Sequence, residues 1–339
     1  MRTGRPDAAR PRASRAARTG AGAGFSLVEL LIAMTVGLVA LTAAAALFAS
    51  SSRARTELQK VAQMAESARY AQDVLTEDLR LAGFYGEMPR IPQATSLPDP
   101  CAVDAADLGW QPNGPLTVPA PLVGIDGGEA APDCVADRLP NTDMIVVRRA
   151  STVAAPLALL DGTPHLQVSL CAADADPVAI GIAAGDFGLR RTDCTAPAPV
   201  RRLLVRIYYV SRCDGCARAG IPTLSRVDLD GASMRTTRLA EGIEDLQLDY
   251  GFDVDGDGTP DVFLPGRSGN AGAPDDDWAN LVAVRVHLLA RSVESPAGWI
   301  DDRTYRLGLR GSVGPFRDGF RRTVLSSTVR LNNPAGRRE

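Results

Sequence analysis

Histidine, lysine and aromatic residues are scarce in this sequence, and the common motifs of catalysis are missing. Its 339 residues include two histidines, His165 and His287, one lysine, Lys60, and 5% aromatic residues. The two histidines have no metal-ligand spacing relative to each other, and no Gly-x-Ser-x-Gly elbow is present. No glycine-rich phosphate loop follows a predicted strand. We therefore expect that the protein is not an enzyme.

Charge is almost missing from residues 25–49, where Glu29 is the only ionisable side chain. As a helix this segment would be roughly 37 Å long, and the apolar core of a bilayer is ~30 Å thick. The segment is therefore predicted to be a transmembrane helix. A carboxylate inside such a helix costs about 2.5–3.5 kcal/mol on insertion scales, which indicates a functional role for Glu29.

Residues 1–24 contain few apolar side chains, six arginines and one aspartate. The arginine-rich side of a membrane helix stays in the cytoplasm, so the region after about Ser50 is expected on the other side. Without residues 1–24 the formal net charge would fall from −3 to −8, which does not favour a nucleic-acid-binding protein. A secretory signal peptide is the alternative, with small residues for cleavage at 43–46. The long apolar run and the place of Glu29 argue against it.

Residues 50–82 predict an amphipathic continuation of this helix, because they contain neither proline nor glycine. The predicted apolar stripe consists of Leu58, Val61, Ala65, Ala68, Leu75, Leu79 and Ala82. The predicted polar face consists of Arg53, Glu57, Lys60, Arg69, Asp73 and Arg80. One helix from about Phe25 to Leu81 is expected, ended by Gly83 and Gly86. A coiled coil is the weaker alternative, because the stripe is rich in alanine and short.

The helical period disappears from residue 90 onward. Residues 90–140 are rich in Pro, Gly, Ala and Asp and are expected to be irregular. Short β-prone segments follow at 144–149, 203–210, 223–230, 246–250, 281–290, 305–309 and 323–331. No helical pattern separates them, which argues against a parallel sheet. We predict the α+β class, with a long N-terminal helix packed on an antiparallel β-sheet.

Residues 24–30 read Gly-Phe-Ser-Leu-Val-Glu-Leu, which closely resembles the processing site of type IV prepilins. Residues 79–84, 242–251 and 321–333 are similar to the corresponding parts of PilW minor pilins. The resemblance implies that a prepilin peptidase cuts after Gly24 and that the new N-terminus, Phe25, is methylated. It also implies that Glu29 meets the N-terminal amine of a neighbouring subunit. The expected parts are a leader (1–24), a spine helix (25–83) and an exported β-rich domain (84–339).

The same resemblance implies a function and a location. A PilW-like minor pilin of a Gram-negative bacterium would start or cap the type IV pilus together with other minor pilins and the major pilin. It would begin as a single-pass inner-membrane protein with a periplasmic domain and end in the pilus. Adhesion, twitching motility or DNA uptake would follow through the pilus. Two alternatives stay open: a J-type pseudopilin of type II secretion, and a calcium-dependent adhesin at a pilus tip.

An acidic loop is the one candidate metal site. Asp253, Asp255, Asp257 and Asp261 occupy positions 1, 3, 5 and 9 of a possible calcium loop, with Gly258 at position 6. Position 12 is Leu264, where an EF-hand has glutamate, so one of the aspartates at 275–277 would have to supply the last ligand. An acidic hairpin turn is the alternative. No other cofactor is expected.

Six cysteines lie after the membrane segment, which favours disulfides formed in an oxidising compartment. They are Cys101, Cys134, Cys171, Cys194, Cys213 and Cys216. Their proximity suggests a Cys101–Cys134 bridge, and the last two have the spacing of a redox motif. Because those two fall between β-prone segments, a small structural disulfide is favoured over redox chemistry.

Two arginine clusters complete the candidates. If residues 201, 202 and 206, or residues 317, 321 and 322, met on one face, they would attract DNA phosphates. Solvated strand faces are the alternative, and we expect no direct nucleic-acid binding.

Overall fold

The computed structural model describes residues 24, 26–89, 91–92, 95–112, 114–160, 162–212, 220–267, 275–296 and 298–336. The chain divides into two compact units between Thr56 and Glu57. Each unit is described by itself below.

The first unit is the N-terminal part of helix α1, whose bounds are Leu27–Leu81. The predicted helix from about Phe25 to Leu81 is therefore confirmed. Polar side chains within the apolar stretch use the helix itself as a partner. The hydroxyls of Thr35, Thr42 and Ser50 donate to the carbonyl oxygen three residues earlier, at 2.9 Å in each case. No hydroxyl of these three residues therefore needs water or a second chain.

In the second unit, one stripe of α1 is buried against the sheets. Its buried apolar residues are Met64, Ala68, Ala71, Leu75 and Leu79. The spacing of three and four is the one that the sequence predicts, and Ala68, Leu75 and Leu79 belong to the predicted stripe. Leu58 is 70% exposed, whereas Met64 and Ala71 are buried and were not predicted. Burial begins one turn later than periodicity alone suggests, because packing decides where a stripe starts.

The end of α1 is held by distant segments. Gly83 has φ +72°, a conformation that favours glycine, and its amide donates to the Arg148 carbonyl at 3.0 Å. The Asn333 side chain donates to the Ala82 carbonyl at 3.0 Å, across a sequence separation of 251. The carbonyl groups of Leu79, Leu81 and Ala82 thus accept hydrogen bonds from the Ala82 amide, the Phe84 amide and Asn333.

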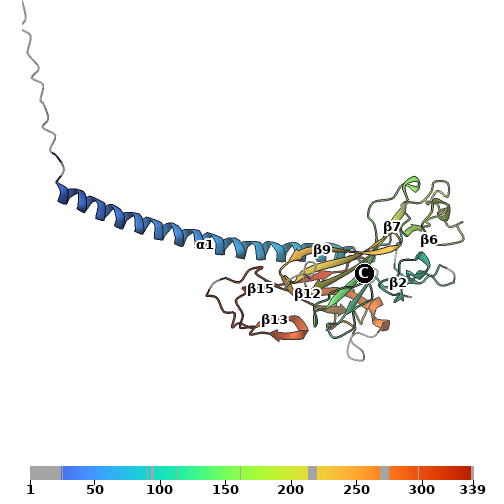
Figure 1. Cartoon of the computed structure of the whole chain (residues 1–339). Coiled ribbons are helices and arrows are strands. Elements are labelled where there is room, and N and C mark those ends of the chain that lie inside the picture. Colours follow the sequence, from blue (N-terminus) through green and yellow to red (C-terminus); the bar gives the residue numbers. More distant parts are fainter. Residues whose placement is uncertain are drawn as a thin grey trace, which may run out of the picture. The chain divides into compact units, whose positions relative to one another are not determined.

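A seven-stranded antiparallel sheet forms one part of the second unit (Figure 1). Its path runs β3 (Leu122–Ile125), β4 (Met144–Ala150), β7 (Val200–Ser211), β5 (His165–Val168) and β6 (Val178–Gly181). Strand β8 (Thr223–Asp230) pairs with β7, and β9 (Ser233–Glu241) pairs with β8. Residues 206–208 of β7 pair with β4 on one side and β8 on the other, so β7 is the central strand.

A four-stranded antiparallel sheet forms the other part. Its order is β11 (Val262–Leu264), β10 (Ile243–Phe252), β12 (Leu281–Arg291) and β15 (Arg322–Arg330). The predicted alternation in β12 is observed, with Val284, Val286 and Leu288 buried and Arg285 exposed. Leu289, on the other face, is buried under β13 (Tyr305–Leu307) and β14 (Gly311–Val313), which form a separate hairpin.

The remaining elements are short. Strands β1 (Thr95–Ser96) and β2 (Val118–Pro119) form one small parallel pair. The 3₁₀ helices are η1 (Ala105–Asp107), η2 (Leu157–Leu159), η3 (Ala184–Asp186), η4 (Asp275–Asn280) and η5 (Gly308–Arg310), and α2 is Asn332–Gly336. In Figure 1 the loops around β6 lie at one end of the second unit and the hairpin with β13 lies at the other.

The core and the disulfides support the predicted class. One hydrophobic cluster combines the α1 stripe with side chains of both sheets. Among the described residues, two disulfides are present: Cys101–Cys134, as predicted, and Cys171–Cys194. Cys213 and Cys216 lie outside the described residues. The fold class, a long N-terminal helix with an antiparallel β domain, is confirmed.

Candidate functional site

The predicted processing segment lies at the start of α1. Gly24 precedes the helix, and Phe25 lies outside the described residues, as do residues 1–23. The Leu30 amide donates to the Ser26 carbonyl at 3.1 Å, which starts the helical ladder. Glu29 lies in the first turn, where the helix dipole favours a negative charge. It is exposed, and no described residue forms a hydrogen bond or ion pair with its carboxylate.

The helix around Glu29 is apolar on all sides. Leu27 is 74% exposed and Phe48 is 77% exposed, and the large apolar side chains between them are exposed as well. The helix is long and apolar enough to cross a membrane, and none of its most apolar window is buried. Soluble proteins rarely leave an apolar surface of this extent in water. This segment therefore requires lipid or other protein around it.

The second unit contains a buried acid that the sequence reasoning missed. Asp78 lies on the packed face of α1 and is only 2% exposed. Arg149 of β4 donates to its Oδ1 from Nε at 3.0 Å and from Nη2 at 2.9 Å. Arg206 of β7 donates from Nη1 to Oδ1 at 2.6 Å and to Oδ2 at 2.8 Å. The Tyr208 hydroxyl also donates to Oδ2.

These contacts hold the Asp78 carboxylate in its ionised form. Burial is the largest single influence and opposes ionisation. The hydrogen bonds from Arg206 and Tyr208 and the charge of Arg149 outweigh it, so the pKa of Asp78 lies below its ordinary value. The sequence contains a pattern that indicates this buried acid. Asp78 follows Leu75 by three residues and Ala71 by seven, so it lies on the apolar stripe.

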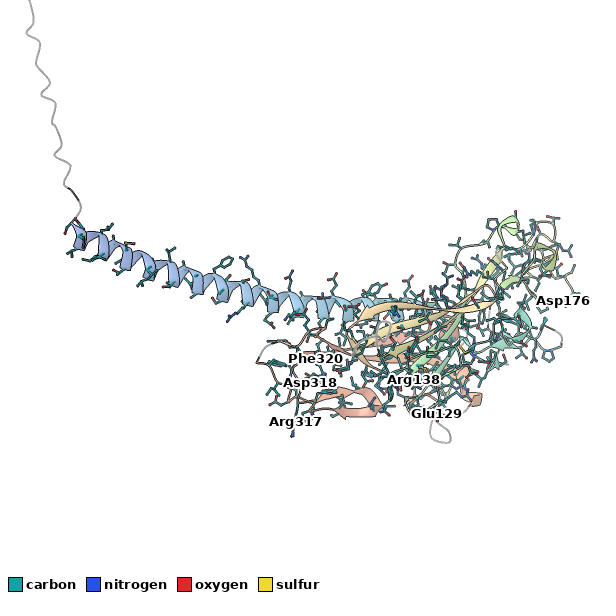
Figure 2. All side chains as sticks on the ribbon, in the orientation of Figure 1. Glu129, Arg138, Asp176, Arg317, Asp318 and Phe320 are labelled. Atoms are coloured by element: carbon teal, nitrogen blue, oxygen red, sulfur yellow. A yellow bond between two sulfur atoms is a disulfide. The ribbon has the colours of Figure 1, made fainter. Side chains whose placement is uncertain are left out.

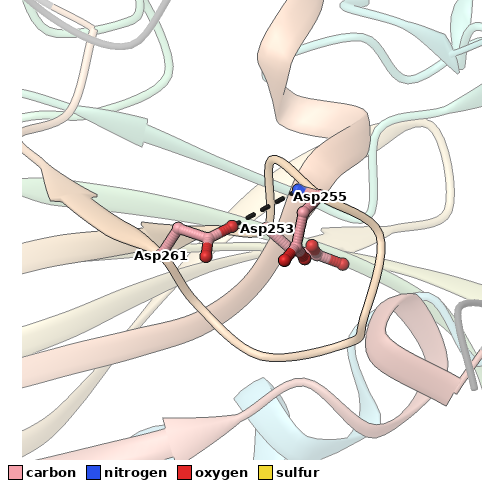
Figure 3. A group of neighbouring side chains, drawn as sticks. All are labelled: Asp253, Asp255 and Asp261. Atoms are coloured by element: carbon pink, nitrogen blue, oxygen red, sulfur yellow. Dashed lines mark hydrogen bonds between the residues drawn. The ribbon is translucent and has the colours of Figure 1, made fainter.

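The acidic loop between β10 and β11 brings three of its four predicted ligands together (Figure 3). Ligand oxygens of Asp253, Asp255 and Asp261 lie within 4.8 Å of one another. The buried Asp253 carboxylate accepts two glycine amides of the loop, and Asp261 Oδ2 accepts the Val254 amide at 2.7 Å. Asp257 is not part of this group, and its Oδ1 accepts the Thr259 amide at 2.7 Å.

The carboxylate oxygens of this loop suit a hard cation such as calcium. The side chains at 275–277, the expected source of a last ligand, lie outside the described residues. Calcium binding by Asp253, Asp255 and Asp261 therefore stays a prediction.

The arginine clusters pair mainly with carboxylates of the chain itself. Arg201 pairs with Glu87 at 2.7 Å, and Arg206 pairs with Asp78. Arg322 has no exposed side-chain surface and contacts Glu244, Asp301 and Asp318. Arg321 lies over the Trp299 ring, 4.4 Å from its centroid. Carboxylates of the chain thus occupy Arg201, Arg206 and Arg322.

His287 also has a structural explanation. Its Nδ1 is 2.8 Å from the Ser326 hydroxyl and its Nε2 is 3.2 Å from Asp249 Oδ2. Such a Ser–His–Asp contact invites comparison with a catalytic triad. The sheet register accounts for it, because His287 faces Ser326 directly in the β12–β15 pairing and Asp249 follows on β10.

Comparisons with known proteins agree with the geometry. A family model described as Type IV Pilus-assembly protein W matches residues 207–333. A pilin-like protein, PilA3, from Thermus thermophilus is 37% identical over 78 residues, which are 23% of this chain and 34% of that protein. The chain therefore matches about a third of that relative's length. A solved type IV-like pilin from Thermus thermophilus covers 80% of this chain and 97% of its own at 10% identity, with a TM-score of 0.37.

The resemblance to the PilW family predicted from the sequence is confirmed by the family match. Over residues 207–333 the chain is thus similar to a family of type IV pilus-assembly proteins.

Proposed function

We propose that this chain is a minor pilin of the type IV pilus and that it helps other minor pilins to start pilus assembly. The observation that carries the proposal is the exposed apolar helix with Glu29 in its first turn, directly after Gly24. The match to the Type IV Pilus-assembly protein W model supports it from the other end of the chain.

In this proposal the prepilin peptidase removes the leader after Gly24 and Phe25 becomes the methylated N-terminus. The chain is held in the inner membrane by α1, with the second unit in the periplasm. Glu29 then pairs with the terminal amine of a neighbouring subunit. Opposite charges attract strongly where water is scarce, and each relieves the desolvation of the other. The pair would select subunits at the correct axial position.

The second unit acts as a recognition domain and not as an enzyme. Through the pilus it would support adhesion, twitching motility or DNA uptake. Within that unit, Asp78 and the buried stripe fix residues 64–79 of α1 to β4 and β7.

Mass spectrometry of the mature N-terminus tests the proposal. The chain is isolated from membranes of cells with and without the prepilin peptidase. We expect a methylated Phe25 in the first case and an intact arginine-rich leader in the second. A leader retained in both strains, or cleavage beyond residue 40, would refute the processing step.

A second measurement distinguishes the pilus from type II secretion. Deletion of the gene should abolish surface pili and leave secreted enzymes unchanged, and complementation should restore the pili. Loss of secretion with normal pili would instead identify a J-type pseudopilin.

A further inference from the structure

Strand β15 is a long outer strand of the four-stranded sheet. Its nine residues all pair with β12, in a register without shifts. In the part of the chain that the structure describes, no strand pairs with its other side. The unpaired backbone groups of such an outer strand are a template for a strand of another chain. The proposed function makes no use of this side of the sheet.

The hydrogen bonds at the two ends of β15 show where its backbone groups point. At one end the Leu331 amide donates to the Val282 carbonyl at 2.8 Å. At the other end the Arg321 carbonyl accepts the Ser292 amide at 2.8 Å. In an antiparallel ladder, the groups that point to the same neighbouring strand belong to alternate residues. The odd-numbered residues of β15 therefore face β12, and the even-numbered residues face away from it.

The amide and carbonyl groups of Val324, Ser326 and Thr328 form the outer side of the strand, which we call the open edge. No described residue forms a hydrogen bond with these backbone groups. Arg303 reaches only the beginning of the strand, where its Nη2 donates to the Arg322 carbonyl at 3.5 Å. A row of donors and acceptors at strand spacing is matched best by another extended backbone.

The other outer strands of the two sheets are blocked. Strand β9 carries Arg235 and Arg238 and has a register shift against β8. Strand β3 is covered, because the Arg267 amide donates to the Gly124 carbonyl at 2.9 Å. Strands β6 and β11 are only four and three residues long. Charge, bulges, covers and short length are the usual protections of outer strands. In β15, by contrast, residues 323–329 carry no charge and pair regularly.

The side chains beside the open edge indicate what kind of strand fits there. On one face of the sheet, Leu325 packs against the main hydrophobic cluster, and the buried Ser327 hydroxyl has no hydrogen-bond partner among the described residues. On the other face, Val324 packs against the cluster around Leu289, and Thr328 is exposed. A charged residue would find no counter-charge in this part of β15. Aliphatic residues and threonine or serine suit these neighbours, because such cross-strand pairs stabilise sheets.

We propose that the open edge of β15 binds an extended, uncharged and β-prone segment of another protein, which continues the four-stranded sheet as a fifth strand. A second copy of this chain fits less well. The register that uses the whole strand would place Arg322 opposite Arg330 of the second copy, and like charges directly opposite one another destabilise a pair of strands. The proposal goes beyond the assembly role, because it concerns a different surface and does not involve Glu29.

Hydrogen exchange resolved to single residues tests the proposal on the full chain in detergent micelles. The probe is a soluble peptide in which threonine and valine alternate between lysine caps. In the chain alone, the Val324, Ser326 and Thr328 amides should exchange at least about tenfold faster than those of Leu325 and Val329. The peptide should slow the first three amides and leave the other two unchanged.

A substitution at Thr328 separates the open edge from the rest of the strand. Thr328→Pro removes one outward amide and keeps the bonds to β12, because an outer strand tolerates proline where its nitrogen faces solvent. It should weaken peptide binding at least about tenfold, as measured by fluorescence anisotropy. Thr328→Val, which keeps the amide and the shape, is the matched control and should bind within about twofold of the original chain. The peptide with N-methylated backbone amides should not bind.

No saturable binding up to about 1 mM peptide, or equal binding by the two Thr328 variants, would overturn the proposal. So would slower exchange that does not select the outward amides. Dimers of the chain alone that Thr328→Pro dissociates, seen by analytical ultracentrifugation, would overturn it in favour of a second copy. If the proline variant does not fold, the exchange pattern of the original chain decides. None of these outcomes depends on cleavage after Gly24 or on Glu29, so they do not test the proposed function.

Discussion

Helix α1 carries one acid in each of two contrasting environments. Asp78, in the second unit, is buried and receives hydrogen bonds from Arg149, Arg206 and Tyr208. Glu29, in the first unit, is exposed and has no ionic partner among the described residues. Within the described residues, the chain supplies counter-charges for Asp78 and none for Glu29. Folding therefore pairs one acid of the helix, and the proposed function assigns the other acid to assembly.

The helix surfaces around the two acids also differ in how their apolar side chains are distributed. Around Asp78 the helix has one buried apolar stripe and a polar outer face. Around Glu29 it is apolar all round. An amphipathic helix is stable on a single domain, whereas a uniformly apolar one needs an apolar environment on every side. Variants at Glu29 and Asp78 test whether the two acids have these different roles.

The largest effect is expected for Glu29→Ala. Assembly should be lost almost completely, because the neighbour's amine would enter an apolar region without a counter-charge. Cleavage after Gly24 and the fold of the second unit should be unchanged. Immunoblots of sheared pili and of membranes would show this. Glu66→Ala, an exposed acid on the same helix, is the control. Normal incorporation of the Glu29 variant would remove the assumed distinction between the two acids.

Asp78→Ala should act on folding instead of on assembly chemistry. Removing the carboxylate leaves the buried Arg149 guanidinium without its ion-pair partner, whereas Arg206 keeps Asp228. Breaking a buried ion pair costs about 3–5 kcal/mol. Urea unfolding of the full chain in detergent, followed by tryptophan fluorescence, measures this loss.

The adjacent exposed acid provides the matched control for that measurement. Glu77→Ala should change the free energy of unfolding by less than about 0.5 kcal/mol. Equal effects at the two positions would mean that the Asp78 contacts contribute little.

A smaller, pH-dependent effect contrasts Asp78 with a second buried acid, Asp143. The pKa of Asp143 is raised to about 7 in the folded chain, so the folded state binds its proton more tightly than the unfolded state. Its contribution is present below the ordinary pKa near 4 and is lost as the pH rises to about 7. Asp78 has a lowered pKa, so its contribution is present above pH ~4 and is lost on further acidification.

The free energy of unfolding, measured from pH 3 to pH 8, would separate the two contributions. Asp143 changes it above roughly pH 4, and Asp78 changes it below roughly pH 4. Asp143→Asn should flatten the decline between pH 4 and pH 7, and Asp78→Asn should flatten the acid limb. An unchanged decline in the Asp143 variant would assign the pH dependence to other groups.

The smallest effect is expected at the acidic loop between β10 and β11. If calcium binds, the midpoint of thermal unfolding should rise with calcium concentration, by about 2.7 kcal/mol in stability at a hundredfold excess over the dissociation constant. Asp255→Asn should abolish the rise. Asp257→Asn should preserve much of it, because Asp257 lies outside the cluster. No shift with calcium would identify an acidic turn.

Strong periodicity made much of the fold predictable. Strand β8 has the predicted bounds, Thr223–Asp230, and β12 and β15 differ from the prediction by about one residue. Strand β9 was missed because it is an exposed strand with arginines and threonines on both faces, so it has no apolar alternation. Strands β5 and β6 were missed because each is only four residues long.

The candidate sites also differ in how well the sequence predicts them. Local motifs such as residues 24–30 and 253–261 consist of residues that are adjacent in the chain, so the sequence shows them directly. Asp78 was missed although its spacing on the stripe was visible, because an acid at an apolar position was not followed to its partners. A polar cavity of about 440 Å³ in the second unit could not be predicted, since its lining joins Asp126, Asp143, Gln247 and Arg310 from four separate segments.

The contact between Asn333 and the Ala82 carbonyl has a consequence for biogenesis. During synthesis on the ribosome, residue 82 emerges long before residue 333. This one contact at the helix end must therefore stay open until nearly all of the following β structure has been made, although Arg148 and Arg149 can bind the helix end earlier. Closing such a long loop is slow, so a holding factor that shields the early segment would speed maturation.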